Sequence, residues 1–141
     1  IYGLAGLRVG YGVSSPCVAD YLNRVRPPFN VSCLAQAAAI AALDDEAHVR
    51  RSLEVNGAGR TFLYEELGRL GVEYTPTQAN FIAFNCGDRG PAICQALLES
   101  GVVVRPLASF GMAPGNLRVT IGAQEENEVF ISALGEILSD G

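Results

Sequence analysis

Hydrophobic and polar positions in the second half of the chain follow a pattern that predicts a small sheet. Residues 81–84, 102–104 and 117–121 are short apolar or alternating runs, which are typical of strands. The last run alternates with a period of two, so its apolar side chains fall on one face and Arg118 and Thr120 on the other. A strand of this kind buries one face and leaves the other in a cleft or in water.

Apolar residues spaced three and four apart predict helices between and after these strands. The first helix covers residues 91–100 and ends at Gly101, and the second covers residues 124–139. Three glutamates crowd the first turns of the second helix, where the helix dipole favours acidic side chains. Strands and helices in this order indicate an α/β domain.

The first half of the chain predicts one strand followed by helices. Residues 7–14 alternate apolar with small or polar side chains, as a strand does. Pro16 suits the first position of a short helix that continues over residues 17–25. The Arg-Pro-Pro sequence at residues 26–28 ends that helix, because proline lacks a backbone donor and restricts the residue before it. We expect a hinge at this point.

Two further helices complete the pattern. An alanine-rich stretch follows Ser32, whose side chain is a good N-cap. After the acidic residues 44–46, a longer helical pattern runs to Gly71, a natural residue just past a helix C-terminus. The predicted fold class is therefore α/β, with a long helix pair and then a small sheet with helices packed on it.

Length and charge narrow the class of protein. The 141 residues suit one domain or slightly more, and the apolar fraction of 49% is that of a globular protein. No apolar run approaches the roughly 20 residues that cross a bilayer. A net charge of −5 without a basic run argues against a nucleic-acid or anionic-membrane partner. The chain opens on patterned sequence without Met or a signal-peptide pattern, so we expect it to be part of a longer protein.

All ten basic residues are arginine, which excludes several chemistries within the chain. Without lysine, no side-chain amine can form a Schiff base. His48 is the single histidine, so a site with several histidine ligands is impossible, and no metal is expected. Cys17, Cys33, Cys86 and Cys94 contain no C-x-x-C pair; we expect them to be buried free thiols in a reducing cytoplasm.

Arg8 is the first candidate for binding chemistry. It lies in the sequence G-L-A-G-L-R-V-G-Y-G, whose glycines let a ligand or another backbone come close. A guanidinium group in such a segment can bind a phosphate with two parallel hydrogen bonds. The alternative, which composition alone favours, is an ordinary salt bridge at the start of a strand.

Arg105 and Arg118 are the other two candidates. Arg105 ends an apolar run, which would place it at the carboxyl end of a buried strand, where α/β folds bind ligands. Arg118 interrupts an otherwise apolar strand. Together they could bind an anionic substrate, although solvated charges at a sheet edge fit the pattern equally well. Asn80 is expected to be a turn residue and His48 a solvated surface residue.

Several segments resemble one known family. The opening I-Y-G-L-A-G-L-R-V-G-Y-G resembles the segment that follows the cofactor lysine in fold-type I pyridoxal-phosphate aminotransferases. The later N-L-R-V-T-I-G resembles the segment with the substrate-anion arginine. Between them, T-Q-A-N-F-I-A-F and G-V-V-V-R-P-L-A-S-F-G-M are similar to the histidinol-phosphate subgroup of that family. The resemblance covers the whole chain.

The resemblance implies a role for each candidate arginine. Arg8 matches the arginine that binds the phosphate of pyridoxal 5′-phosphate, the implied cofactor. Arg118 matches the substrate-anion arginine, and Arg105 matches a second arginine near the substrate phosphate. The Schiff-base lysine would fall immediately before Ile1, so the chain itself would hold no catalytic residue and would be inactive alone.

The resemblance also implies a domain division and a reaction. Residues 1–30 would be a remnant of the large cofactor-binding domain, and residues 31–141 would form the small C-terminal domain that closes over the substrate. The reaction would be amino transfer between histidinol phosphate and 2-oxoglutarate in histidine biosynthesis, by a cytoplasmic homodimer. Another class I/II aminotransferase or threonine-phosphate decarboxylase is the first alternative. A non-catalytic α/β module that binds a phosphorylated small ligand through Arg105 and Arg118 is the second.

Overall fold

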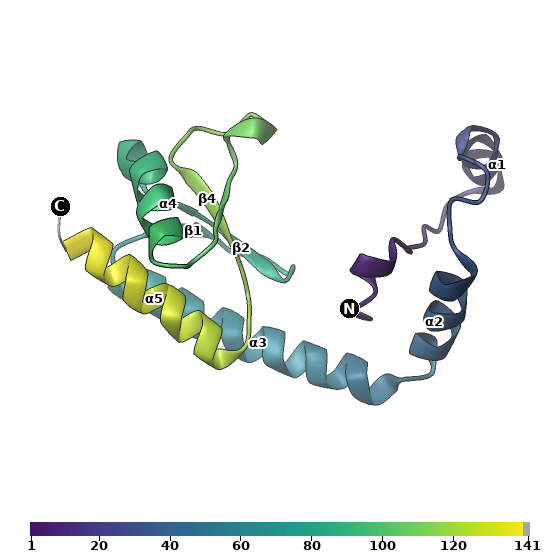
Figure 1. Cartoon of the computed structure of the whole chain (residues 1–141), viewed down its shortest axis with the longest axis horizontal. Helices are drawn as coiled ribbons and strands as arrows, with labels where there is room; N and C mark the ends of the chain where they lie inside the picture. The colour runs from purple at the N-terminus through teal and green to yellow at the C-terminus, as the bar shows by residue number, and fades with distance from the viewer. Residues whose placement is uncertain (140–141) are drawn as a thin grey trace. The chain divides into compact units, whose positions relative to one another are not determined.

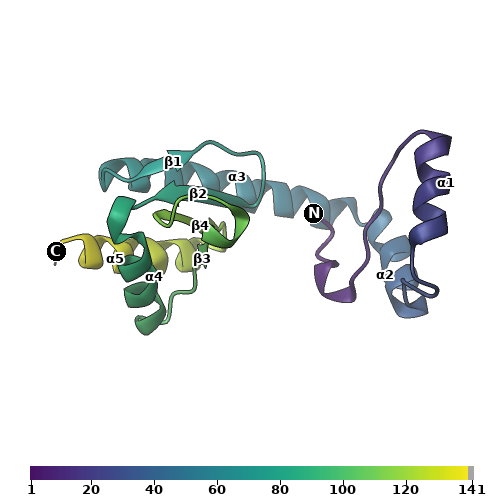
Figure 2. The ribbon, with the colours of Figure 1, turned by 90° about the horizontal axis from the view of Figure 1, so that it is seen from above.

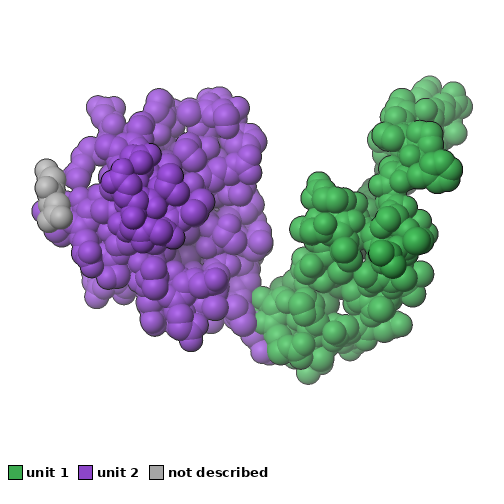
Figure 3. Space-filling view, in the orientation of Figure 1, with its two compact units in different colours: residues 1–53 green, residues 54–141 purple. Residues whose placement is uncertain are grey.

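The computed structural model describes residues 1–139. The chain divides into two compact units, Ile1–Leu53 and Glu54–Gly141, which Figure 3 shows in different colours. Helix α3 (Glu46–Arg69) begins in the first unit and ends in the second. Among the residues described, no helix combines the length and apolar character that a membrane span needs.

The first unit consists of short helices joined by irregular segments. Its elements are the 3-10 turn η1 (Ala5–Leu7), helix α1 (Pro16–Val25), helix α2 (Cys33–Leu43) and the start of α3. As predicted, Pro16 starts α1, and the Ser32 side chain caps α2 by accepting a 3.1 Å hydrogen bond from the Ala35 N–H. Within residues 1–53 Ala35 alone is buried, so this unit leaves most of its apolar side chains at least partly exposed.

No strand forms where the alternation of residues 7–14 predicts one. The chain turns in η1, and residues 8–15 have no regular secondary structure. A strand persists only when its N–H and C=O groups pair with a neighbouring strand, and residues 1–53 contain no second strand. The strand prediction for this segment is therefore wrong, whereas the helix after it and the break at the prolines are confirmed.

The second unit is built around a four-stranded antiparallel sheet (Figure 1). The strands are β1 (Glu73–Thr75), β2 (Phe81–Asn85), β3 (Arg105–Pro106) and β4 (Asn116–Thr120), in the spatial order β1-β2-β4-β3. Strands β2 and β4 lie where the pattern predicts them. The pattern does not predict β1, because three residues are too few to show alternation.

The strand predicted at residues 102–104 is displaced toward the C-terminus. Pairing with β4 begins only at Arg105. The Val102 N–H instead donates a 2.8 Å hydrogen bond to the Leu97 C=O at the end of helix α4 (Gly90–Glu99), and Gly101 adopts a positive φ of 81°. This helix-ending turn uses the backbone at the start of the run, so the apolar triplet forms no ladder.

Helices α3, α4 and α5 (Gln124–Ser139) share one core with a single face of the sheet. Helices α4 and α5 lie side by side (Figure 2). The fully buried large side chains of the core are Leu63, Leu67, Ile82, Phe84, Ile93, Leu97, Leu117 and Leu134. An edge-to-face contact at 5.7 Å joins Phe84 of β2 to Phe130 of α5. The predicted α/β fold, a helix pair followed by a small sheet with helices packed on it, is confirmed.

Gly59 allows helix α3 to approach the turn that precedes α5. A Cβ atom at this position would lie 2.7 Å from Ile121 Cγ2 and 2.8 Å from Asn127 Nδ2. Both neighbours are buried. Asn127 is also held by two hydrogen bonds with Gly122, from the Gly122 N–H to Oδ1 at 2.9 Å and from Nδ2 to the Gly122 C=O at 3.1 Å. A side chain at position 59 would therefore displace groups that have little freedom to move.

We expect Gly59→Ala to lower the free energy of unfolding by about 1–3 kcal/mol, because the added methyl group overpacks this contact. Gly57→Ala in the same helix is the matched control, since a Cβ there meets no atom within 4 Å. It should raise the free energy of unfolding by about 0.5–1 kcal/mol through helix propensity. Urea unfolding followed by far-ultraviolet circular dichroism measures both effects. Equal effects of the two substitutions would contradict the close approach described.

Candidate functional site

Arg105 and Arg118 lie opposite each other on the two neighbouring strands β3 and β4. They are register partners in this antiparallel pair, and Ala83 of β2 is the partner of Arg118 on its other side. Partners across a ladder project from the same face of the sheet. Leu117 and Val119 project into the core, so the two arginines lie on the face that the core does not use. We call this the open face.

The half-buried Arg118 rests against an aromatic ring and has an unpaired donor. Its Cζ atom lies 4.8 Å from the centre of the Phe81 ring. Its Nε atom is buried and has no hydrogen-bond partner within residues 1–139. An unpaired buried donor costs about 1–3 kcal/mol, so the position favours an acceptor supplied by a ligand. A carboxylate or phosphate oxygen is such an acceptor.

Arg105 is exposed and is also held against an aromatic ring. Its Cζ atom lies 5.0 Å from the centre of the Phe110 ring, which belongs to the 3-10 turn η3 (Ala108–Phe110) directly after β3. The two phenylalanines were missed by the sequence analysis. Phe81 lies two positions before Ala83, the register partner of Arg118, and hence on the same face as the arginines, which only the β2–β4 register reveals.

Within the part of the chain that the structure describes, the charges of the two arginines are not balanced. Neither residue forms an ion pair with an acidic side chain of residues 1–139. Two guanidinium groups on directly opposed residues repel each other. A bound anion removes that repulsion and accepts hydrogen bonds from donors arranged in a planar fork. The two unpaired guanidinium groups on one face are therefore candidates for binding an anionic ligand.

Arg105 does not lie at the carboxyl end of a strand, where the sequence predicts it, although it remains a candidate. Arg105 starts β3 and does not end a strand. The rule that ligands bind at the carboxyl ends of strands also applies to parallel sheets, and this sheet is antiparallel. The register between β3 and β4 is what brings Arg105 to Arg118.

Arg8 belongs to the first unit and keeps most of its donors free. It follows η1 in the left-handed conformation, with φ 56°, and its Nη1 donates a 2.9 Å hydrogen bond to the Ala5 C=O. Within residues 1–139 it forms no ion pair, so the salt-bridge alternative is not seen there. At the neighbouring Gly6 and Gly10 a Cβ would meet no atom within 4 Å. The exposed guanidinium thus lies in an open, glycine-rich segment that a phosphate can approach.

Among residues 1–139, neither Asn80 nor His48 forms a hydrogen bond with Arg8, Arg105 or Arg118. Asn80 is exposed ahead of β2, and its C=O accepts a 2.9 Å hydrogen bond from the Ile121 N–H, as suits a turn residue. His48 is half-buried on α3, and its Nε2 lies 3.4 Å from Ser52 Oγ. The ring is therefore only partly solvated, because the helix and the nearby Gly3 cover part of it.

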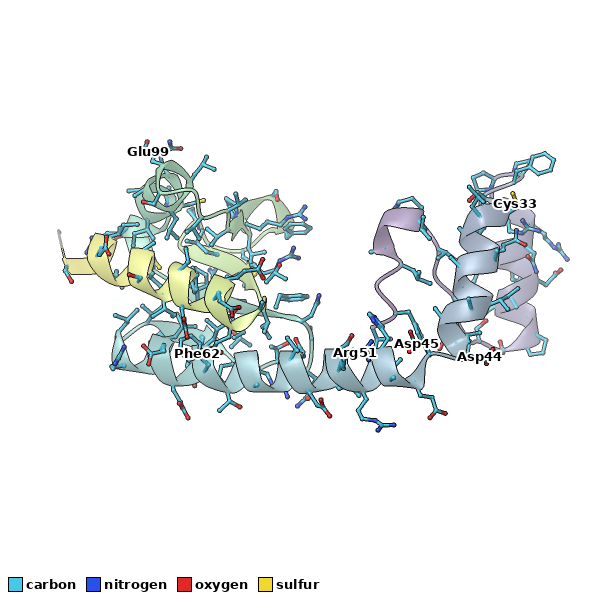
Figure 4. All side chains as sticks on the ribbon, turned by 60° about the horizontal axis from the view of Figure 1, so that its bottom comes forward. Cys33, Asp44, Asp45, Arg51, Phe62 and Glu99 are labelled. Carbon is cyan, nitrogen blue, oxygen red and sulfur yellow. The ribbon has the colours of Figure 1, made fainter. Side chains whose placement is uncertain are left out.

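The four cysteines are free thiols, but they are not all buried. Cys17 and Cys33 are exposed, the latter at the start of α2 (Figure 4), while Cys86 and Cys94 are half-buried. The expectation of burial is thus wrong for the first two, because the helices that carry them have few packing partners. Burial raises the pKa of the Cys86 thiol, and the charge of Arg89 offsets part of this rise. Residues 1–139 contain no group of side chains suited to hold a metal ion.

Comparison with known proteins identifies the family that has this fold. A family model described as aminotransferase class I and II matches residues 1–134. The chain therefore belongs to the class I and II aminotransferases.

Among curated proteins, the chain is similar to histidinol-phosphate aminotransferases. The chain is 50% identical over 140 residues to histidinol-phosphate aminotransferase 1 of Nitrosococcus oceani. The aligned region covers 99% of this chain and 38% of that protein. It is 54% identical over 139 residues to histidinol-phosphate aminotransferase of Moorella thermoacetica, covering 99% of this chain and 36% of that protein. The chain thus spans less than two fifths of the length of these relatives.

Solved structures show the same arrangement of elements. Histidinol-phosphate aminotransferase from Clostridium acetobutylicum superposes with a TM-score of 0.89 at 26% identity, covering 99% of this chain and 43% of that one. The enzyme from Sinorhizobium meliloti, in complex with pyridoxal-5′-phosphate, gives a TM-score of 0.85 at 30% identity and covers 99% and 39%. The fold is that of part of an aminotransferase.

We expect Arg118→Lys to weaken binding of inorganic phosphate by about tenfold, because lysine keeps the charge but loses the planar fork and the Nε donor. Titration calorimetry of the 141-residue chain measures the affinity. Arg24→Lys is the matched control, since Arg24 pairs with Asp20 on helix α1 of the first unit and is not part of the sheet. Phosphate affinity of Arg118→Lys equal to that of the unsubstituted chain would exclude a role for the fork.

Proposed function

We propose that this chain is part of a pyridoxal-phosphate-dependent aminotransferase that transfers the amino group between histidinol phosphate and 2-oxoglutarate. The observation that carries the proposal is identity of 50–54% over nearly the whole chain to proteins named histidinol-phosphate aminotransferase. The anion-binding character of the open face supports it, because the amino donor carries a phosphate and the acceptor carries carboxylates.

Arg8 would hold the phosphate of the cofactor. Its exposed guanidinium has donors to spare, and the glycines around it leave room for a phosphate group. When bound, pyridoxal 5′-phosphate supplies the electron sink that amino transfer needs. The contribution of Arg8 is to bind and orient that phosphate.

Arg118 would bind the anionic group of the substrate, with Arg105 as the second cation beside it. A phosphate monoester and a carboxylate both accept two parallel hydrogen bonds from a guanidinium group. One pair of arginines can therefore serve both half-reactions, in which histidinol phosphate and glutamate are bound in turn. The unpaired Nε of Arg118 fits this role, since the substrate would supply the missing acceptor.

The division of the chain between two domains is a part of the proposal. Residues 1–30 would belong to the large cofactor-binding domain and residues 31–141 to the small domain that closes over the substrate. The exposed apolar side chains of the first unit support this, since Val13 and Phe29 are 91% and 98% exposed. Apolar surface of this extent is normally covered by a partner surface, here the rest of the protein and its homodimer partner.

The proposal is tested with the complete product of the gene that encodes this chain. We expect kcat/KM for histidinol phosphate, with 2-oxoglutarate as acceptor, to exceed that for phenylalanine or tyrosine. We also expect no release of CO2 from threonine phosphate. The 141-residue chain, which contains no lysine, should show no transamination on its own.

Other outcomes identify the alternatives directly. Preference for an aromatic amino acid would make the protein a different aminotransferase of the same class. Decarboxylation of threonine phosphate would make it the related decarboxylase. Phosphate binding without turnover of any of these substrates would favour a non-catalytic anion-binding module.

A further inference from the structure

We propose that Phe81 and Phe110 are positioning residues, which hold the guanidinium groups of Arg118 and Arg105 in a preformed arrangement for binding an anion. The proposal rests on the proposed function only in taking that anion to be the acidic group of the substrate. Its evidence is the geometry of the open face.

Phe81 is placed beside Arg118 by the register of the sheet. Ala83 is the partner of Arg118, so Phe81, two positions earlier on β2, projects from the same face as a diagonal neighbour. The ring centre lies 4.8 Å from Arg118 Cζ. Core packing does not explain the ring, since Ile82 and Phe84 of the same strand fill the core from the opposite face.

Phe110 is placed beside Arg105 by the turn that follows β3. The Leu107 N–H donates a 3.0 Å hydrogen bond to the Asn116 C=O of β4, and the Phe110 N–H donates one of 3.0 Å to the Leu107 C=O. Gly111 then closes the turn with φ 82°. The backbone therefore places Phe110 next to Arg105, and its ring centre lies 5.0 Å from Arg105 Cζ although the side chain is 61% exposed. Burial in the core does not account for an aromatic residue here.

The two ring contacts counteract the repulsion between Arg105 and Arg118, which the strand register places opposite each other. Arg105 and Arg118 repel each other across the ladder, and no acidic side chain of residues 1–139 pairs with either. Long side chains under such repulsion turn away from each other. The face of an aromatic ring attracts a guanidinium group and leaves the N–H groups at its edge free to donate.

Positioning of this kind lowers the cost of binding. An arginine side chain loses rotamer freedom when it is fixed on a ligand, and that loss is avoided when the ring has already fixed it. The effect requires the π-face and not simply apolar volume. Tyrosine in place of phenylalanine should therefore keep the effect, whereas leucine should lose it.

The test follows the Nε–Hε signals of the 141-residue chain by nuclear magnetic resonance during titration with inorganic phosphate. The chain has ten arginines and no lysine, so the spectrum is simple, and Arg105→Lys and Arg118→Lys assign the two relevant signals. Phe81→Leu and Phe110→Leu are compared with Phe81→Tyr and Phe110→Tyr. Phe29→Leu, at a 98% exposed position of the first unit, is the matched control.

We expect each leucine variant to weaken phosphate binding about three- to tenfold, and each tyrosine variant and the control to stay within about twofold of the unsubstituted chain. The Arg118 or Arg105 signal should also move toward that of a free side chain in the corresponding leucine variant. Because Phe110 is exposed, its variants test the proposal even if a variant at Phe81 fails to fold.

Two results would overturn the proposal. One is phosphate affinity in both leucine variants equal to that of the unsubstituted chain. The other is a titration in which neither arginine signal moves, which would remove the anion site itself. Failure of the gene product to use histidinol phosphate would overturn the proposed function and would leave these phosphate-binding results unchanged.

Discussion

The antiparallel pairing of β2 with β4 is the constraint on which the second unit depends. Its register sets Ala83 opposite Arg118 and Phe84 opposite Leu117. Side chains alternate between the two faces of the sheet, so in both strands every second residue faces the core and the others lie on the open face. A slip of one residue would bury the arginine and expose the leucine. The same pairing of β2 with β4 therefore completes the hydrophobic core and places Arg118 on the open face. A change in this register would alter both the stability of the second unit and the candidate binding site.

Much of the fold could be predicted because the strong signals are local. Helix α5 has the bounds that its apolar spacing predicts, and Ser32 and Pro16 start the helices that their chemistry favours. The wrong strand predictions lie where the structure depends on whether a neighbouring strand is available for hydrogen bonding. Residues 7–14 have the alternation of a strand but no neighbouring strand, and residues 102–104 follow a helix-ending turn that uses their first backbone donor. Alternation predicts which face is apolar, not whether a partner exists.

The candidate site was predictable by residue type but not by arrangement. The polar interruption at Arg118 indicated a side chain facing away from the core, and the family resemblance implied roles for Arg8, Arg105 and Arg118. Opposition of Arg105 to Arg118 needs the β3–β4 register, which joins residues separated by a turn and cannot be counted along the chain. Phe81 and Phe110 were missed for the same reason: an aromatic residue looks like core until the face it occupies is known.

The central claim is that Arg105 and Arg118 act together on one anion. A double-mutant cycle measures this directly, with Arg105→Gln, Arg118→Gln and the double variant of the 141-residue chain titrated with inorganic phosphate. Our account predicts that the two losses are not additive, with a coupling energy of about 1 kcal/mol or more, because both side chains bind the same phosphate. Losses that simply add, within about 0.3 kcal/mol, would mean that the arginines act independently and would contradict it.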